Sequence, residues 1–254
     1  RFNLHPLVLE DILNTDQRPK VDEYADYIFI VARFFEYEAV TGTVGSDQVS
    51  IVLGADFVLT FQERPTGTFD PLRERLRADK GQIRKLGADY LAYSLLDTLV
   101  DRYFAVLEQL TERTEALEDK LLLQATPALL KEIHEIKREA MVMRRAVWPL
   151  REVINSLTRA DQRFFKPETQ PYLRDIYDHT VHVIESLESI RDLIAGMLDI
   201  YLSSISNRVN LEVRILTVIT TLFMPAALLA GTLRLTSRPM PPTTHREGHR
   251  TALG

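Results

Sequence analysis

The fold is decided by one long run without a strong helix breaker before Pro225: residues 170–233 read QPYLRDIYDHTVHVIESLESIRDLIAGMLDIYLSSISNRVNLEVRILTVITTLFMPAALLAGTL. Its first half repeats apolar or small residues at alternating spacings of four and three, which predicts a helix with one apolar face. The members of this stripe are Leu173, Ile176, Thr180, Val183, Leu187, Ile190, Ile194, Met197 and Tyr201. A helix over the whole run would be roughly 95 Å long, too long to be buried inside one subunit. We therefore expect a coiled stalk made by several copies of the chain.

The end of this run, Ile215–Leu233, has no charged residue between Arg214 and Arg234. A helix of about 20 such residues spans the hydrocarbon core of a bilayer, so we expect one transmembrane helix. A buried helix of a soluble core is the alternative. Arginines flank the segment on both sides, and their larger number after it favours a cytoplasmic tail.

Two further helical stripes precede the run and predict a long antiparallel hairpin within residues 88–169. The first contains Leu99, Tyr103, Val106, Leu110, Leu117 and Leu121, with a polar break near Arg113 and Thr114. The second contains Leu129, Ile133, Ile136, Ala140, Met143, Val147, Leu150, Ile154 and Leu157. Thr126 and Pro127 are typical of the start of a helix, and Pro149 should kink the second helix.

Residues 1–87 predict part of an α/β domain. The segment Tyr27–Tyr37 is rich in aromatic and β-branched residues and is expected to form a central strand. Two apolar runs, Gln48–Leu53 and Phe57–Gln62, flank a short turn and predict a hairpin. Asp70, followed by proline, is expected to cap a short helix. Residues 234–254 lack apolar periodicity and should be a disordered tail.

Composition excludes several classes of protein. The chain of 254 residues has no cysteine, which excludes disulfide scaffolds and thiolate metal sites. Its net charge is −5 and no basic stripe occurs, so we expect no nucleic-acid partner. No nucleophile elbow, zinc-protease motif or phosphate loop is present, so we do not expect an enzyme. His179 and His182 lie three residues apart without a third ligand and are interpreted as surface histidines.

Five segments together resemble the CorA-type magnesium transporters. They are HPLVLEDILNTDQRPK (5–20), ADYLAYSLLDTLVDRYF (88–104), WPLREV (148–153), YLRDIYDH (172–179) and LDIYLSSISNRVN (198–210). The resemblance covers residues 1 to about 231. It implies a homopentamer in the cell (inner) membrane with most of the chain on the cytoplasmic side, opposite to the orientation that the arginines favour. No other protein partner can be inferred from it.

The resemblance also assigns the parts of the chain. It implies an α+β cytoplasmic domain (1–87), a long helical hairpin (88–169), a stalk helix (170–214) and a pore-lining transmembrane helix (215–233). After Gly231, Arg234, Leu235 and Thr236 stand where the family has Gly-Met-Asn. We therefore expect this chain to lack that signature and the second membrane helix, as a truncated transporter would.

Mg²⁺ prefers oxygen ligands and keeps much of its water, so a few carboxylates suffice to bind it. By resemblance, Asp11 faces Asp175 of the neighbouring subunit, and Glu10 with Asp97 forms a weaker second site. From the residues alone, Asp97 and Asp175 border apolar stripes and are better explained as solvated or salt-bridged carboxylates than as metal ligands. The resemblance implies that Mg²⁺ is both the regulatory ion and the transported ion, with Co²⁺ as a second cargo.

By resemblance, one face of the membrane helix lines the pore. The expected lining residues are Asp199, Asn210, Val213, Leu216, Thr217, Thr220 and Met224. Val213 and Leu216 would form an apolar constriction, which resists a hydrated cation. Packing within a helix bundle is the alternative for these positions.

The sequence thus favours a subunit of a pentameric divalent-cation channel gated by intracellular Mg²⁺. Two alternatives stay open. One is a membrane-anchored coiled-coil assembly protein without transport, and the other is a zinc transporter of the same superfamily.

Overall fold

The computed structural model describes residues 2–38, 42–79, 81–159 and 163–236, with side chains up to residue 231. Contacts divide the chain into two units, Arg1–Tyr201 and Leu202–Gly254. The first unit contains a four-stranded sheet and the helices packed around it, and the second contains the C-terminal part of one long helix.

The sheet has four antiparallel strands in the order β1-β2-β3-β4. They are β1 (Lys20–Glu23), β2 (Tyr27–Glu38), β3 (Thr43–Gly54) and β4 (Val58–Gln62). The expected central strand and the hairpin between β3 and β4 are confirmed, with Leu53 opposite Val58 at the turn. Strand β1 was not predicted, because its four residues are mostly polar and only partly buried.

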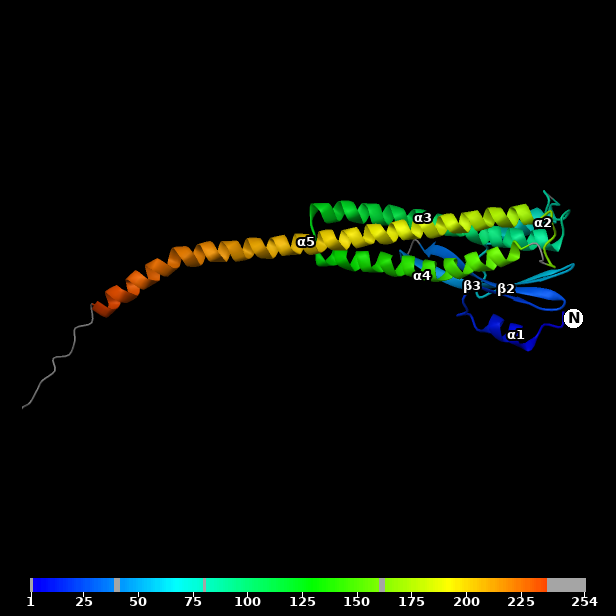
Figure 1. The fold of residues 1–254 in the computed structure, drawn as a ribbon, viewed down its shortest axis with the longest axis horizontal. Helices are drawn as coiled ribbons and strands as arrows, with labels where there is room; N and C mark the ends of the chain where they lie inside the picture. The colour runs from blue at the N-terminus through cyan, green and yellow to red at the C-terminus, as the bar shows by residue number, and fades with distance from the viewer. Residues whose placement is uncertain (1, 39–41, 80, 160–162, 237–254) are drawn as a thin grey trace, which may run out of the picture. The chain divides into compact units, whose positions relative to one another are not determined.

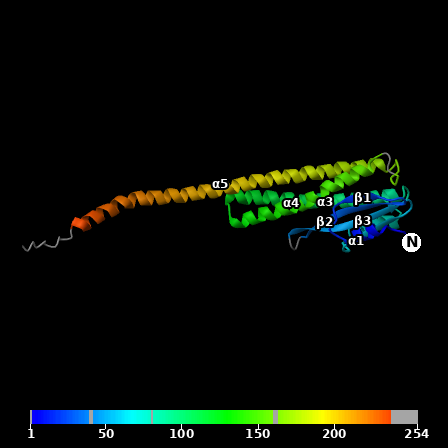
Figure 2. The same ribbon diagram turned by 60° about the horizontal axis from the view of Figure 1, so that its bottom comes forward.

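Helices cover both faces of this sheet, as Figures 1 and 2 show. On one face, α1 (Pro6–Leu13) places Val8 against Tyr27, Phe29 and Val31 of β2. On the other face lie α3 (Ala88–Leu123) and α4 (Pro127–Leu157). Side chains alternate between the two faces along a strand, and β2 is buried on both, which explains its nearly continuous apolar sequence.

Helix α2 (Asp70–Arg77) forms where it was expected, but its cap differs from the prediction. Phe69 occupies the cap position and makes no side-chain cap hydrogen bond. Asp70 is instead the first helical residue, and its carboxylate accepts a hydrogen bond from Arg73 at 2.7 Å. The proline that follows Asp70 fits this first turn because a first-turn N–H needs no helical partner.

The long hairpin of α3 and α4 is confirmed. Every member of the two predicted apolar stripes is buried. Thr126 caps α4 by accepting a hydrogen bond from the backbone N–H of Leu129, and the helix continues through Pro149. Thr114, which we interpreted as a polar break, is fully buried and donates its hydroxyl proton to the carbonyl of Leu110.

Helix α5 (Gln170–Thr236) begins in the first unit. All nine members of its predicted stripe, from Leu173 to Tyr201, are at most 9% exposed within this single chain. An ion pair of 2.9 Å between Arg144 and Glu188 joins α4 to α5. The expectation that this stripe needs helices from other copies is therefore wrong for residues 173–201, because the hairpin of the same chain covers them.

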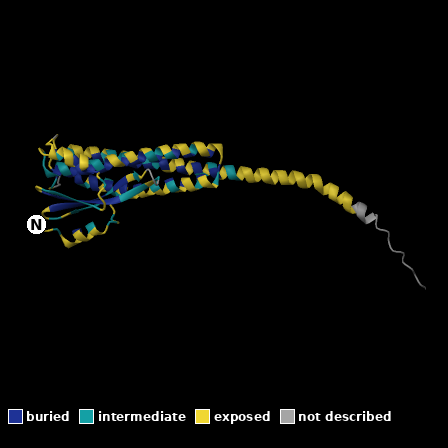
Figure 3. Cartoon of the chain, turned by 180° about the vertical axis from the view of Figure 1, so that it is seen from behind, coloured by how far each residue is buried: buried dark blue, intermediate teal, exposed yellow. Residues whose placement is uncertain are grey.

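The second unit shows the opposite pattern. From Leu202 to Gly231, no residue of α5 is buried, and Figure 3 shows nearly all of this stretch in the colour of exposed residues. An apolar window in it reaches a mean hydropathy of 1.9, so the helix is long and apolar enough to cross a membrane. The helix continues to Thr236, past the expected start of the tail at 234, and residues 237–254 of that tail lie outside the described residues.

Candidate functional site

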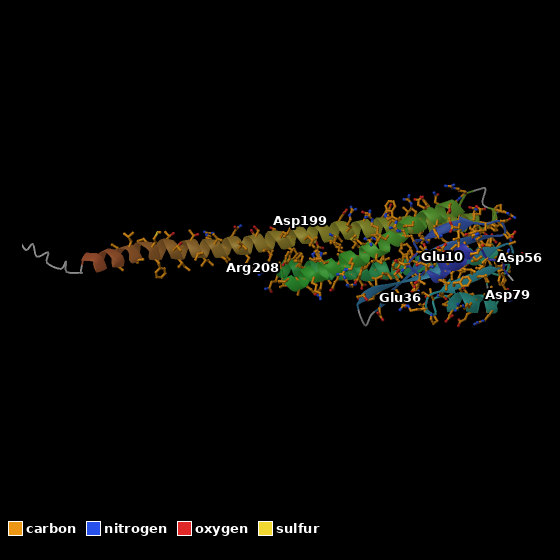
Figure 4. All side chains as sticks on the ribbon, turned by 90° about the horizontal axis from the view of Figure 1, so that it is seen from below. Glu10, Glu36, Asp56, Asp79, Asp199 and Arg208 are labelled. Carbon is orange, nitrogen blue, oxygen red and sulfur yellow. The ribbon has the colours of Figure 1, made fainter. Side chains whose placement is uncertain are left out.

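Two of the predicted metal ligands lie on α1. His5 starts this helix by accepting a hydrogen bond from the N–H of Leu7 at 3.2 Å, and Pro6 suits the first turn. Glu10 is exposed to solvent, and Figure 4 labels it on the short N-terminal helix. The Asp11 side chain is only 16% exposed, since it turns toward the edge of the sheet.

Asp11 already has a cationic partner in its own chain. The ammonium of Lys20 lies 2.7 Å from Oδ2 of Asp11 and 2.8 Å from Oδ2 of Asp22. Burial lowers the pKa of Lys20, but the hydrogen bonds to the two carboxylates outweigh that effect and raise the pKa above its usual value. Lys20 therefore links α1 to strand β1 through salt bridges to both carboxylates.

Gln48 of β3 contacts the C-terminal part of α1 and holds it in place. Its side chain is buried, and its amide donates to the main-chain carbonyl of Asp11 at 2.8 Å and to the hydroxyl of Ser50. Its oxygen accepts from the N–H of Gln17 at 3.1 Å. Asp11 is thus held by two contacts, one from its side chain to Lys20 and one from its main-chain carbonyl to Gln48.

The other two predicted ligands lie together on α3 and α5. Asp97 is partly buried, and this burial, together with the negative charges of Asp101 and Asp175, raises its pKa. His179 and a hydrogen bond from Tyr93 act in the opposite direction. Asp175 is 61% exposed at its side chain, with His179 at 4.0 Å. The structure therefore places Asp97 and Asp175 in one acidic cluster within the subunit.

The four predicted ligands thus fall into two pairs, one on α1 and the other on α3 and α5. No hydrogen bond or ion pair among the described residues connects Asp11 to Asp175, or Glu10 to Asp97. Within the described part of the chain, no group of three or more histidines, cysteines or carboxylates is arranged to hold a metal. The donor oxygens suit Mg²⁺, but each pair alone supplies too few of them for a closed site.

Apolar side chains surround both acidic pairs at the surface. On α1, Leu7, Leu9 and Leu13 are 56%, 47% and 82% exposed. Beside the other pair, Tyr172 lies with its ring centroid 5.2 Å from those of both Tyr90 and Tyr93. Exposed large apolar side chains next to charged groups are typical of a surface that contacts another protein.

The predicted pore residues lie on the exposed part of α5. Asp199 is exposed in the first unit, where Figure 4 labels it. Asn210, Val213, Leu216, Thr217, Thr220 and Met224 are all exposed in the second unit. Thr217 donates its hydroxyl proton to the carbonyl of Val213 at 2.8 Å, and Thr220 donates to that of Leu216 at 3.0 Å. Such bonds make threonine compatible with a helix in lipid.

Sequence reasoning missed Lys20, Gln48 and Asp89. Lys20 and Gln48 act through contacts with α1 that join residues far apart in the chain, so no local pattern indicates them. Asp89 is 2% exposed and accepts hydrogen bonds from the loop before α5. The signal that could have found Asp89 is its place in the first turn of α3, two residues after Gly87, where a carboxylate interacts favourably with the helix dipole.

A separate cavity of about 340 Å³ between the sheet and α4 does not belong to this site. Arg18, Arg33 and Arg145 line it, with Asp16 as the one carboxylate among the described lining residues. The guanidinium of Arg33 is committed to the carbonyl of Thr15 and to Ser46. Its positive lining makes this cavity unsuited to a divalent cation.

Comparison with known proteins relates the whole chain to one group. A family model described as "CorA-like Mg2+ transporter protein" matches residues 1–249, beyond Gly231, where we expected the resemblance to end. The cobalt/magnesium transport protein CorA of Thermotoga maritima is 44% identical over 99% of this chain and 72% of its own length. A putative metal ion transporter of Bacillus subtilis is 31% identical over 100% of this chain and 78% of its own length.

Solved structures share the fold. The complete structure of the CorA magnesium transporter from Methanocaldococcus jannaschii superposes with a TM-score of 0.81, covering 95% of this chain and 76% of that one at 21% identity. The full-length CmaX protein superposes with a TM-score of 0.79, covering 98% of this chain and 75% of that one. The mixed α/β domain followed by long helices is thus an architecture found in full-length transporters.

Proposed function

The chain belongs to the CorA-like Mg²⁺ transporter family, a family of divalent-cation transporters and not of enzymes, and from this premise we propose its role. It is a subunit of a homopentameric channel for Mg²⁺ and Co²⁺ in the cell membrane, with its sheet and hairpin on the cytoplasmic side. Intracellular Mg²⁺, bound between subunits, closes the channel. The names of two relatives, a cobalt/magnesium and a magnesium transporter, support the choice of cargo.

One observation carries the gating part of the proposal: the four acidic residues lie in two separate pairs within a subunit. Glu10 and Asp11 are neighbours on α1, while Asp97 and Asp175 interact electrostatically across α3 and α5. If α1 of one subunit meets the α3 and α5 face of the next, Asp11 pairs with Asp175 and Glu10 with Asp97. The exposed leucines of α1 and the exposed Tyr172 would then be covered by the same contact.

The chemistry follows from charge. Four carboxylates brought to one interface repel one another, which disfavours the closed arrangement when no cation is present. Mg²⁺ supplies the positive charge that allows Asp11 and Asp175 to stay close, and it needs few protein oxygens because it keeps most of its water. A fall in the Mg²⁺ concentration would therefore loosen the interfaces and favour the open pore.

The exposed apolar half of α5 supports the transmembrane part of the proposal. Residues 202–231 contain no buried residue, and exposure of this many large apolar side chains to water would be strongly unfavourable. Lipid on one face and copies of the same helix on another would cover them. The face with Asn210, Val213, Leu216, Thr217, Thr220 and Met224 then lines the pore, with Asp199 as a charged ring at the end of the first unit.

The absence of cysteine from the sequence makes a direct test possible. We expect the double variant D11C/D175C to form disulfide-linked species of up to about five subunits on mild oxidation in detergent, and each single variant to form none by this contact. The pair E36C/D175C serves as the control, because Glu36 is near the end of β2 (Tyr27–Glu38), whereas α1 packs against residues in the first half of that strand. If D11C/D175C forms no disulfide-linked species, or if the control forms them equally well, the proposed interface is ruled out.

Transport is tested separately in proteoliposomes with Mg²⁺, Co²⁺ and Zn²⁺ as alternative cargoes. Uptake of Mg²⁺ that slows as internal Mg²⁺ rises is the expected result. Uptake of Zn²⁺ alone would instead identify a zinc transporter. Assembly without uptake of any of the three ions would identify an assembly protein.

A further inference from the structure

We propose that the ammonium of Lys20 is a built-in competitor of the divalent cation at Asp11, and that it moves to Asp22 alone when the divalent cation binds. This inference rests on the proposed sensing role of Asp11 and adds a residue that sets the Mg²⁺ concentration at which sensing occurs. It is drawn from one arrangement, a single lysine held between two carboxylates from different elements.

The geometry places Lys20 between its two partners. Lys20 begins β1, and Asp22 follows two residues later on the same side of that strand, because side chains alternate along a strand. Asp11 reaches the ammonium from α1. The two Nζ–Oδ2 distances, 2.7 Å to Asp11 and 2.8 Å to Asp22, are nearly equal, so the lysine is shared by both carboxylates.

The surroundings hold the lysine in place without enclosing it. The ring of Phe29, which lies opposite Asp22 in the sheet, has its centroid 6.0 Å from Nζ. The Lys20 side chain is 35% exposed and that of Asp22 is 40% exposed, so the ammonium can shift toward Asp22 while remaining hydrated. The Asp11 side chain, which is 16% exposed, is the more buried of the two partners, and it is the one that would bind the divalent cation.

Electrostatics then predicts competition. A divalent cation on Asp11 would stand within a few ångströms of the ammonium, where like charges repel strongly in a partly buried setting. Asp22 offers the ammonium a second partner, so the exchange does not leave it unpaired. Lys20 thus lowers the affinity of Asp11 for the cation, and Asp22 offsets part of that loss.

Two variants are expected to shift the Mg²⁺ response in opposite directions. K20M removes the competing charge and should lower the Mg²⁺ concentration at half-maximal response by about tenfold. D22N removes the alternative partner, leaves Lys20 bound to Asp11 alone and should raise that concentration severalfold. K20R keeps the positive charge and should stay within about twofold of the original protein.

The response is measured on the full chain in detergent as the Mg²⁺ dependence of protection from chymotrypsin, and separately as the shift of the thermal midpoint. The control is K131M, which removes a positive charge from α4, where Lys131 is 81% exposed. Thermal midpoints without Mg²⁺ show whether each variant is folded. D22N still tests the exchange if K20M fails to fold.

Opposite shifts for K20M and D22N, with K131M unchanged, would support the proposal. A response of K20M equal to that of the original protein, or shifted to higher Mg²⁺, would overturn the proposal and leave Lys20 with only a structural role. D11N distinguishes the two levels of the argument. If D11N keeps the full Mg²⁺ response, the sensing function itself fails; if D11N abolishes the response while K20M and D22N change nothing, only the competition fails.

Discussion

The carboxylate of Asp89, in the first turn of α3, accepts a hydrogen bond of 2.6 Å from the hydroxyl of Thr169, the residue before α5. Both side chains are buried. The same Asp89 oxygen accepts a hydrogen bond from the N–H of Lys166 at 3.1 Å, and the ammonium of Lys166 lies 3.7 Å from the other oxygen. This contact fixes where α5 begins relative to the hairpin.

We expect D89A to destabilise the first unit by about 3 kcal/mol, because it leaves the buried hydroxyl of Thr169 and the N–H of Lys166 without an acceptor. D89N keeps one acceptor oxygen and should cost less. The measurement is the thermal midpoint in detergent. D56A, at an exposed bend, is the control, and equal midpoints for D89A and D56A would contradict the assigned role.

The burial boundary near Tyr201 predicts different effects on its two sides. I190A removes a buried side chain that packs inside the subunit and should cost about 2–5 kcal/mol of stability. V209A changes a side chain that is 50% exposed and should leave the stability of the first unit unchanged. Thermal unfolding of both variants checks this. A comparable loss in V209A would mean that residues beyond 201 contribute to the fold of the subunit.

The raised pKa of Asp97 predicts a pH dependence in the absence of Mg²⁺. In the folded chain the Asp97 carboxyl keeps its proton at pH values where the same carboxyl in the unfolded chain, with its ordinary pKa of 3.8, has lost it. Stability from this group is therefore greatest below pH 3.8 and is lost as the pH rises through the raised pKa. D97N should raise the thermal midpoint near neutral pH and flatten its pH dependence in this window.

The pH series is run with a chelator present, and D199N is the control because Asp199 is exposed. A D97N curve that is parallel to that of the original protein would show that Asp97 is not the group responsible. Added Mg²⁺ should reverse the order at neutral pH, since it stabilises the ionised carboxylate and not the amide.

The apolar ring proposed at Leu216 predicts the effect of a polar replacement. L216N should speed Mg²⁺ uptake into proteoliposomes severalfold, because an amide in place of an apolar side chain keeps the constriction wet. L216M preserves the apolar character and should leave the rate within about twofold. If L216N and L216M behave alike, residue 216 does not lie at a constriction.

Sequence periodicity predicted the helices well, because each stripe in α3, α4 and α5 records which face a helix buries. It could not say what covers a stripe. The residues from Leu173 to Tyr201 have the pattern expected of a coiled stalk, yet they pack on the hairpin of their own chain, since burial by a neighbouring helix and burial by another subunit produce the same spacing.

The site was predicted less completely than the fold. The resemblance supplied the four carboxylates, and the structure shows how they divide between two surfaces of one subunit. Strand β1 and Lys20 escaped notice, because a short polar strand at a sheet edge has neither the length nor the alternation that marks a buried strand. The lysine matters only through contacts that the fold creates.

The threonine hydroxyls of α5 bear on how an ion would travel past them. Thr217 and Thr220 each give their proton to a backbone carbonyl, so only oxygen lone pairs remain to meet a solute. Water molecules bound to Mg²⁺ point their hydrogens outward and seek lone pairs. Such threonines lining a pore would accept hydrogen bonds from the hydration shell of the cation and would offer no donor to an anion. The pore would therefore select cations over anions before the ion loses any water.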